Sequence, residues 1–226
     1  MGPPQPPPFS PLVLITLIVV VAASSVTFWL LVRRATSHRQ WVALSDWARD
    51  TGFRFGKAAP TEVPPPLDLL KNVSPTVRLS LSKGPTTLVQ LESVGSTASG
   101  AGTPASEPRR VVWHLLLRQI EADWRPTGLR PASATASALD LFSLSSFPTL
   151  GSTERFVAYG TDSAAARVVS KSMLRSLLPA DVGLLLHGRY LVLDFSGRPF
   201  DTIEFGRMLA LSEQLATHLP VATSKA

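Results

Sequence analysis

The chain of 226 residues contains no cysteine, and this absence limits both its chemistry and the ways in which it can be stabilised. Disulfide bonds, thiol nucleophiles and thiolate metal ligands are all excluded. The sequence also lacks a GxSxG elbow, a kinase-like HRD loop and a GK[ST] phosphate loop. Its four histidines do not stand in a metal-binding spacing such as HExxH. We therefore predict no metal, no cofactor and no local catalytic motif.

Charged residues are absent from one long stretch, residues 12–32, which reads LVLITLIVVVAASSVTFWLLV. At about 1.5 Å per residue, a helix of this length spans about 30 Å, which is the thickness of the hydrocarbon core of a bilayer. Its four hydroxyl side chains can bond to carbonyl groups of the same helix. The stretch therefore predicts a single membrane-spanning helix.

The two flanks of this stretch differ in charge. Residues 1–11 form a Pro-rich tail without Lys or Arg, whereas Arg33, Arg34 and Arg39 follow the apolar stretch. Because short segments rich in Lys and Arg stay in the cytoplasm, we predict an inner-membrane protein with its N-terminus outside and its domain in the cytoplasm. Trp29 lies at the basic end and suits the headgroup boundary. These four residues, from Trp29 to Arg39, are the predicted membrane interface.

A cleaved signal peptide is the alternative, and it would export the rest of the chain. Val21-Ala22-Ala23 offers small residues at a spacing that a signal peptidase could use. However, the charged n-region is missing and the apolar stretch continues past these residues, so a retained anchor is favoured.

The chain is basic, with a formal net charge of +6 and a pI of about 10.3. Much of the excess lies between Arg33 and Lys57, where it would attract anionic lipid headgroups by about 1 kcal/mol per basic residue. The other basic residues are scattered and are not interleaved with aromatic residues, so nucleic acid is not a predicted partner. Arg is far more frequent than Lys, which is typical of GC-rich bacterial genomes.

The residues after the membrane segment are enough for one domain with a hydrophobic core. The predicted layout is a tail at 1–11, a transmembrane helix at 12–32, a basic juxtamembrane helix at 33–57, a soluble domain at 58–221 with a flexible loop at 95–108, and a frayed tail at 222–226. Gly52 is expected to end the juxtamembrane helix as a left-handed cap. Trp41 and Trp47 favour either an interfacial helix or packing on the domain, and we favour the second.

Hydrophobic alternation predicts several strands in the soluble domain. Residues 76–92 alternate around a turn at Lys83-Gly84-Pro85, which indicates a β-hairpin. Residues 110–119 are apolar on both faces and predict a central strand. Residues 155–159 predict a short strand, and residues 162–178 predict a helix. Residues 132–148 give at most one helical turn.

The last part of the domain has the clearest local signals. Residues 184–186 and 190–195 flank His187-Gly188-Arg189, which predicts a second hairpin. The closing helix begins with Asp201 and Glu204 as a capping box, and Phe200 is placed to pack on Phe205. Its predicted apolar face consists of Phe205, Met208, Leu209, Ala216 and Leu219, with Ser212 outside it. Hairpins without βαβ units predict an α+β fold with an antiparallel sheet.

Few residues are candidates for chemistry. His114 is the one histidine expected in a buried strand, where a structural role is commoner than a catalytic one. Asp194, Asp201 and Glu204 lie close together in sequence, but the helix cap explains two of them. The segment 121–125 mixes charges with a tryptophan and is either an exposed binding edge or a solvated loop.

The last third of the chain resembles a group of uncharacterised bacterial membrane-anchored proteins with an α+β soluble domain. The resemblance rests on Arg155-Phe156, Tyr159-Gly160, Ala166-Arg167, Leu177-Leu178, the strands around Gly188 and the amphipathic closing helix. It implies an architecture and no activity, because no activity is established for that group.

Two hypotheses for function follow. The first is a membrane-anchored binding or scaffolding module with a lipid surface and an unknown protein as partners, and it has no catalytic residues. The second is an anchored, hydrolase-like enzyme whose site is assembled from distant loops. A deep pocket that holds His114 with a carboxylate would favour the second hypothesis.

Overall fold

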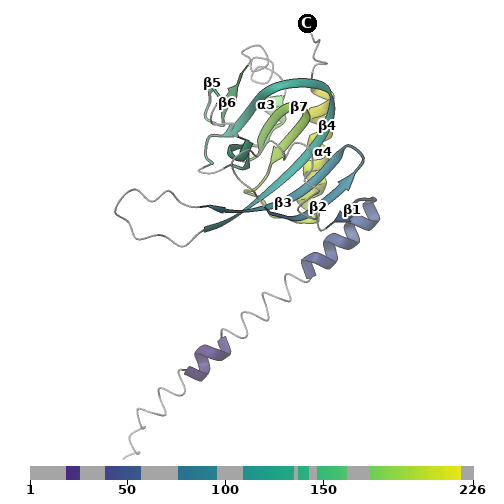
Figure 1. Cartoon of the computed structure of the whole chain (residues 1–226), viewed down its shortest axis with the longest axis vertical. Helices are drawn as coiled ribbons and strands as arrows, with labels where there is room; N and C mark the ends of the chain where they lie inside the picture. Colours follow the sequence, from purple (N-terminus) through teal and green to yellow (C-terminus); the bar gives the residue numbers. More distant parts are fainter. Residues whose placement is uncertain are drawn as a thin grey trace, which may run out of the picture. The chain divides into compact units, whose positions relative to one another are not determined.

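The computed structural model describes residues 19–25, 39–56, 76–95, 109–134, 137–142, 147–161 and 174–219 (Figure 1). The chain forms two compact units, Met1–Asp46 and Trp47–Ala226. The second unit contains an antiparallel sheet with helices, which confirms the predicted α+β class.

The larger unit is built on a seven-stranded sheet. Its strands are β1 (Arg54–Gly56), β2 (Thr76–Lys83), β3 (Thr86–Gly95), β4 (Arg109–Pro131), β5 (Thr149–Ser152), β6 (Phe156–Gly160) and β7 (Gly183–Asp194). The helical elements are η2 (Ala138–Phe142), α3 (Leu174–Leu177), α4 (Thr202–His218) and a helix over residues 39–51.

The long strand β4 is paired on both edges. Near its start, Leu116 lies between Leu88 of β3 and Leu193 of β7. Near its end, Gly128 lies between Tyr159 of β6 and Leu185 of β7. The strand predicted at residues 110–119 is therefore central, as expected, but it continues as far as Pro131. Strand β4 thus joins the β1–β2–β3 part of the sheet to the β5–β6 part.

The predicted second hairpin is wrong, because residues 183–194 form the single strand β7. Its first half pairs with the second half of β4, and its second half pairs with the first half of β4. Gly188 has a φ of 55°, in the left-handed region, and lies opposite Trp124 where the register shifts. A single left-handed glycine produces a bulge, whereas a two-residue type I′ turn needs two consecutive residues with positive φ. The chain therefore bends at Gly188 without reversing.

The first predicted hairpin is confirmed. Strands β2 and β3 pair from Lys83 and Thr86 outwards, and Gly84 in the turn has a φ of 53°. The predicted turn in residues 132–148 is the 3₁₀ helix η2, and the short strand predicted at residues 155–159 is β6.

The helix over residues 39–51 ends as predicted, with Gly52 at a φ of 76°. The N–H of Phe53 donates to the carbonyl of Ala48 at 2.7 Å, and that of Gly52 donates to Arg49 at 3.2 Å, which completes a Schellman motif. The Trp47 ring stacks on Phe53 with centroids 5.2 Å apart and meets Phe205 of α4 edge-on at 5.5 Å. The packing of Trp47 on the domain is thus confirmed.

The predicted membrane span falls mostly outside the described residues. Within it, residues 19–25 are helical and expose Val19, Val20 and Val21. In the described part of the chain, no helix is both long and apolar enough to cross a membrane. The tails at 1–11 and 222–226, residues 96–108 of the predicted loop and residues 162–173 of the predicted helix also lie outside the described residues.

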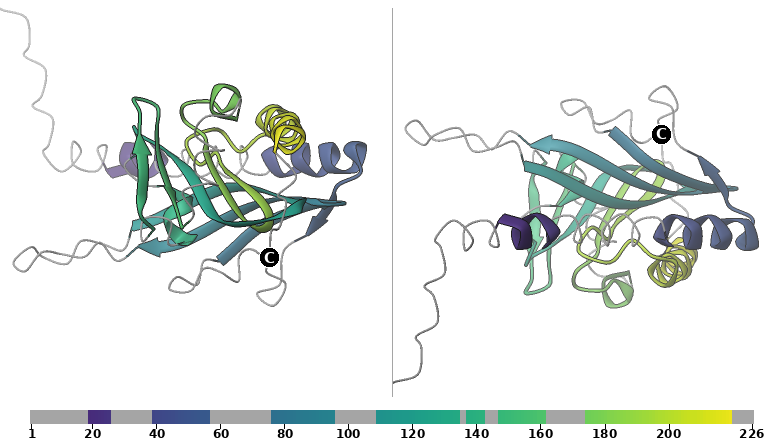
Figure 2. Two further views of the ribbon diagram at one scale, coloured as in Figure 1. Left: turned by 90° about the horizontal axis from the view of Figure 1, so that it is seen from above. Right: turned by 90° about the horizontal axis from the view of Figure 1, so that it is seen from below.

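Side chains are buried on both faces of the sheet. The ribbon views show α4 against one side of the sheet (Figure 2). One face carries a cluster that packs against η2 and includes Val89, Leu91, Leu115, Leu117, Leu139, Leu185 and Val192. The helix α4 packs against β4 and β7. Here the rings of Phe195 and Phe200 lie 6.4 and 4.5 Å from Phe205. Burial on both faces explains why β4 and β7 contain runs of apolar residues without alternation.

The start of α4 confirms part of the predicted cap. One carboxylate oxygen of Asp201 accepts hydrogen bonds from the N–H groups of Ile203 at 3.0 Å and Glu204 at 2.9 Å. The contact between Phe200 and Phe205 is the expected hydrophobic staple. However, the Glu204 carboxylate accepts hydrogen bonds from Arg198 and Arg207, so it is engaged away from the cap.

The buried face of α4 is rotated relative to the predicted one. The residues buried on α4 are Glu204, Phe205, Met208, Leu211, Ser212 and Leu215. Leu209, Ala216 and Leu219 are only half-buried. Ser212 can be buried because its hydroxyl donates to the carbonyl of Leu209 at 2.7 Å.

Substitutions on α4 test this face. We expect Leu215→Ala to destabilise the domain by about 2–5 kcal/mol, because Leu215 is fully buried and the change leaves a cavity. Leu209→Ala should cost clearly less, and Asp201→Ala about 0.5–2 kcal/mol through loss of the cap. Urea melts of a fragment that begins at Arg39 measure all three. An equal loss for Leu209 and Leu215 would contradict the observed face.

Candidate functional site

Of the four predicted membrane-interface residues, the structure describes one. Trp29, Arg33 and Arg34 lie outside the described residues. Arg39 is the first described residue of the helix over 39–51, and its side chain is exposed. Their role at a membrane stays a prediction.

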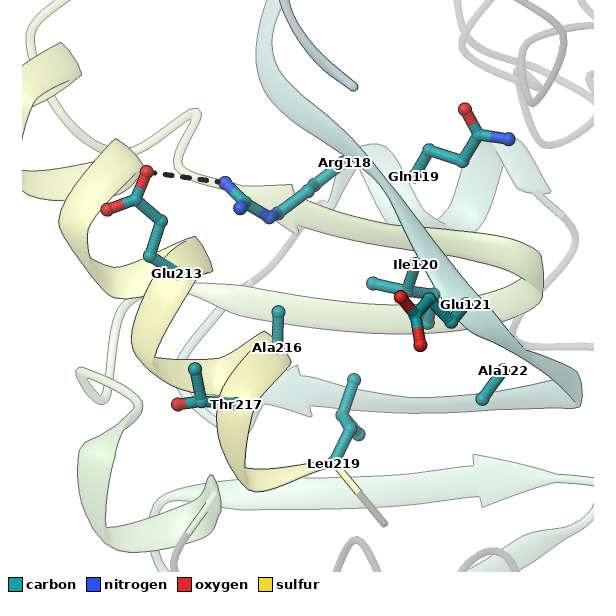
Figure 3. Close-up of a pocket in the computed structure, with 9 residues that line it drawn as sticks. All are labelled: Arg118, Gln119, Ile120, Glu121, Ala122, Glu213, Ala216, Thr217 and Leu219. Atoms are coloured by element: carbon teal, nitrogen blue, oxygen red, sulfur yellow. Dashed lines mark ion pairs between the residues drawn. The ribbon is translucent and has the colours of Figure 1, made fainter. Parts of the chain in front are cut away.

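A pocket of about 490 Å³ lies between the middle of β4 and the C-terminal half of α4 (Figure 3). It is lined by Arg118, Gln119, Ile120, Glu121 and Ala122 of β4, by Glu213, Ala216 and Thr217 of α4, and by Leu219. The pocket coincides with an irregular pairing. Strand β4 advances from Gln119 to Trp124 while β7 advances only from Tyr190 to Gly188. The surplus residues of β4 form one wall of the pocket, as bulges next to binding sites often do.

The pocket has a charged end and an apolar part. The Arg118 guanidinium reaches from β4 towards α4, where its Nη1 lies 3.6 Å from Oε1 of Glu213 (Figure 3). The same nitrogen donates to the hydroxyl of Thr86 at 3.4 Å. Side chains of Ile120, Ala122 and Ala216 supply apolar surface. The segment 121–125, predicted as an exposed edge or a loop, is therefore part of a strand, and two of its residues line this pocket.

A second cluster of polar groups surrounds the buried carboxylate of Asp194. Its Oδ2 accepts from the Ser137 hydroxyl at 2.6 Å and the Ala138 N–H at 2.7 Å. Its Oδ1 accepts from the N–H and the hydroxyl of Ser196. The bonds from Ser137 and Ala138 fix the start of η2 against the end of β7, and the bonds from Ser196 fix the turn that follows β7. Asp194 and Asp201 are close in sequence, but their carboxylates accept hydrogen bonds from different groups and do not form a shared acid–base site.

His114 is half-buried beside this cluster. Its Nδ1 lies 3.1 Å from the carbonyl oxygen of Arg198, and its Nε2 lies 3.3 Å from the side-chain nitrogen of Gln90. A carbonyl can only accept, so Nδ1 carries the proton and Nε2 accepts from Gln90. The ring also packs on Phe200, with centroids 4.7 Å apart. Burial lowers the pKa of His114, against the opposing effects of the Arg198 carbonyl and the Asp194 charge.

Ser196, His114 and Asp194 are near one another but are not arranged as a catalytic triad. In a triad, the histidine ring joins the serine hydroxyl to the carboxylate. Here the Ser196 hydroxyl donates directly to Asp194 and accepts from the backbone N–H of His114 at 3.0 Å, whereas the ring is bonded elsewhere. His114 is thus a satisfied structural residue, and it does not line the pocket of Figure 3.

A third cluster joins α4 to the loop before β7. Arg198 makes a bidentate contact with Asp181 at 2.7 and 2.8 Å and donates to buried Glu204 at 3.0 Å. Burial by itself would raise the pKa of Glu204, but the hydrogen bonds from Arg198 and Arg207 outweigh it and lower that pKa. The hydrogen bond from Arg198 also lowers the pKa of Asp181. These paired charges hold structure in place, and no group of metal-binding residues occurs in the part of the chain described.

The domain is an α+β fold in which an antiparallel sheet bends along β4 and α4 packs on one face. No family model matches the chain, and no curated protein is similar to it in sequence. A solved structure with a similar fold is the crystal structure of the mycobacterial trehalose monomycolate transport factor A, TtfA. The likeness has a TM-score of 0.53 at 12% identity and covers 79% of this chain and 93% of that one. At this identity the likeness shows the fold alone.

The two half-buried histidines predict how stability depends on pH. Burial lowers the pKa of both His114 and His187 below the usual 6.5. The unfolded chain therefore binds more protons just below pH 6.5, so stability is complete above that pH and falls as the pH is lowered. The lowered pKa values of Glu204 and Asp181 make stability depend on pH only in a more acidic range, below about pH 4.5.

Urea melts between pH 5 and 7.5 measure this effect. His114→Gln and His187→Gln should each flatten the dependence, and the double variant should remove most of it. A native domain that becomes more stable as the pH falls from 7 to 5 would contradict the assignment.

Proposed function

We propose that this chain is a membrane-anchored binding module that assists a transport system and carries out no catalysis of its own. Residues 12–32 anchor it in the inner membrane, and the α+β domain lies in the cytoplasm, where it holds a protein partner. The basic flank that contains Arg33, Arg34 and Arg39 rests on anionic lipid headgroups.

The proposal rests on one observation: the side chains that could act as acids, bases or nucleophiles are engaged in hydrogen bonds that hold the fold together. Asp194, His114 and Ser196 are committed to hydrogen bonds that join β4, β7 and η2. Arg198 and Glu204 are committed to each other and to their neighbours. The fold is similar to that of a mycobacterial trehalose monomycolate transport factor, which supports a transport role by analogy of fold alone. A pocket that holds His114 with a carboxylate would favour the enzyme hypothesis, and the pocket between β4 and α4 does not contain His114.

The orientation can be tested with reporters fused after Ala226 of the full chain. We expect a reporter that fluoresces only in the cytoplasm to be bright, because the basic residues follow the apolar stretch. Replacing Arg33, Arg34 and Arg39 with Gln should weaken this orientation. The same change at exposed Arg125, Arg189 and Arg207 should not. A dark fusion together with an active periplasmic phosphatase fusion would reverse the assignment.

The partner can be sought by crosslinking in the native cell, followed by mass spectrometry. The full chain is compared with a chain that ends at Asp46 and so keeps the anchor but lacks the domain. We expect a component of a membrane transport system to be captured only by the full chain. If both chains capture the same proteins, or the domain alone turns over a substrate, the binding-module proposal is wrong.

A further inference from the structure

The pocket between β4 and α4 contains an arginine, Arg118, that has only long contacts within the part of the chain that the structure describes. Arg118 and Arg198 are about equally buried, with 21% and 20% of their side chains exposed. Arg198 makes three contacts of 2.7–3.0 Å with carboxylates. By contrast, the Arg118 guanidinium lies 3.4 Å from the hydroxyl of Thr86 and 3.6 Å from the carboxylate of Glu213. Charge-assisted bonds are normally about 2.7–2.9 Å long, so Arg118 can donate to an oxyanion that comes closer.

The present partner of Arg118 is easily displaced. The side chain of Glu213 is 65% exposed, and an ion pair with such a well-hydrated group contributes little to stability. Glu213 can therefore turn into solvent when another anion approaches Arg118. Arg198 differs from Arg118, because its partner Glu204 is buried. Separating that pair would cost more free energy, since it would leave a buried charge unpaired.

The rest of the pocket suits an aliphatic chain. Ile120 is buried, and Ala122, Ala216 and Leu219 are half-buried, so all four offer apolar surface beyond the guanidinium. The small side chains of Ala122 and Ala216 leave space that larger residues would fill. The volume of about 490 Å³ is within the range of pockets that enclose a small ligand.

We propose that this pocket binds a medium-chain fatty carboxylate. Its carboxylate replaces Glu213 on Arg118, and its alkyl chain lies along Ile120, Ala122, Ala216 and Leu219. A planar carboxylate matches the fork of one guanidinium group. A dianionic phosphate fits less well, because Glu121 and Glu213 are close by and there is one arginine to offset them. A cation would rely on Glu121 and Glu213, which are both exposed, and would leave Arg118 unused.

This inference goes beyond the binding of a protein partner and does not depend on it. The test uses the full chain in nanodiscs of zwitterionic lipid, titrated with octanoate by isothermal titration calorimetry, with empty nanodiscs as the blank. Arg118→Gln should weaken binding by about tenfold or more, as expected for the loss of a charge-assisted hydrogen bond. Glu213→Gln should strengthen it by about threefold, because it removes the competitor. Arg125→Gln, an exposed change on the same strand outside the pocket, should have no effect.

One further substitution, a cationic ligand and a truncated chain provide independent tests of the proposal. Ala216→Leu fills the apolar part with a good helix former and should abolish octanoate binding without loss of stability. Octyltrimethylammonium, with the same chain length, should not bind. The proposal is overturned if the cation binds in place of octanoate or if Glu213→Gln weakens octanoate binding. It is also overturned if octanoate binds only to a chain that ends at Leu219, since residues 220–226 would then be the natural occupant.

Discussion

The structure depends on the need to pair the backbone of one strand, β4, along 23 residues. Buried N–H and C=O groups must find partners, and β4 is buried on both faces at residues 115–117 and 127–129. Strands β3 and β6 share the pairing of one edge, and β7 pairs the other edge at both ends. This arrangement forces β7 to follow β4 through its bend. The bend, the glycine bulge and the pocket therefore have a single cause.

The polar clusters hold the remaining elements to this sheet. The carboxylate of Asp194, at the end of β7, accepts a hydrogen bond from the first residue of η2. This strand residue therefore fixes η2, which covers one face of the sheet. Arg198 ties Asp181, which precedes β7, to Glu204 in the first turn of α4 on the other face. Each cluster replaces water around a buried charge with fixed partners, as a low dielectric requires. Chemistry-bearing residues can therefore gather in space and still be entirely structural.

The sequence was sufficient for features that are determined locally. The Gly84 turn, the Gly52 cap, the Asp201 cap and the Phe200 staple are all decided within about six residues, and each was predictable. Features decided by distant partners were not. Gly188 reads as a turn in isolation, but pairing with β4 makes it a bulge. On α4, Leu209 and Leu215 are equally apolar, and only the position of the sheet decides which one is buried. The pocket combines residues about 100 positions apart, and no local pattern could reveal it.

The contrast between two arginines links this structure to function. An arginine that only supports a fold is expected to have its donors filled, because unfilled donors of a half-buried cation cost free energy. Arg198 meets this expectation, with short bonds to two carboxylates. Arg118 is equally buried but keeps long contacts to a hydroxyl and an exposed glutamate. It stands where β4 and β7 lose register and beside small apolar residues of α4. The long contacts of Arg118, at the edge of the apolar part of the pocket, are better explained by a bound ligand than by a contribution to the stability of the fold.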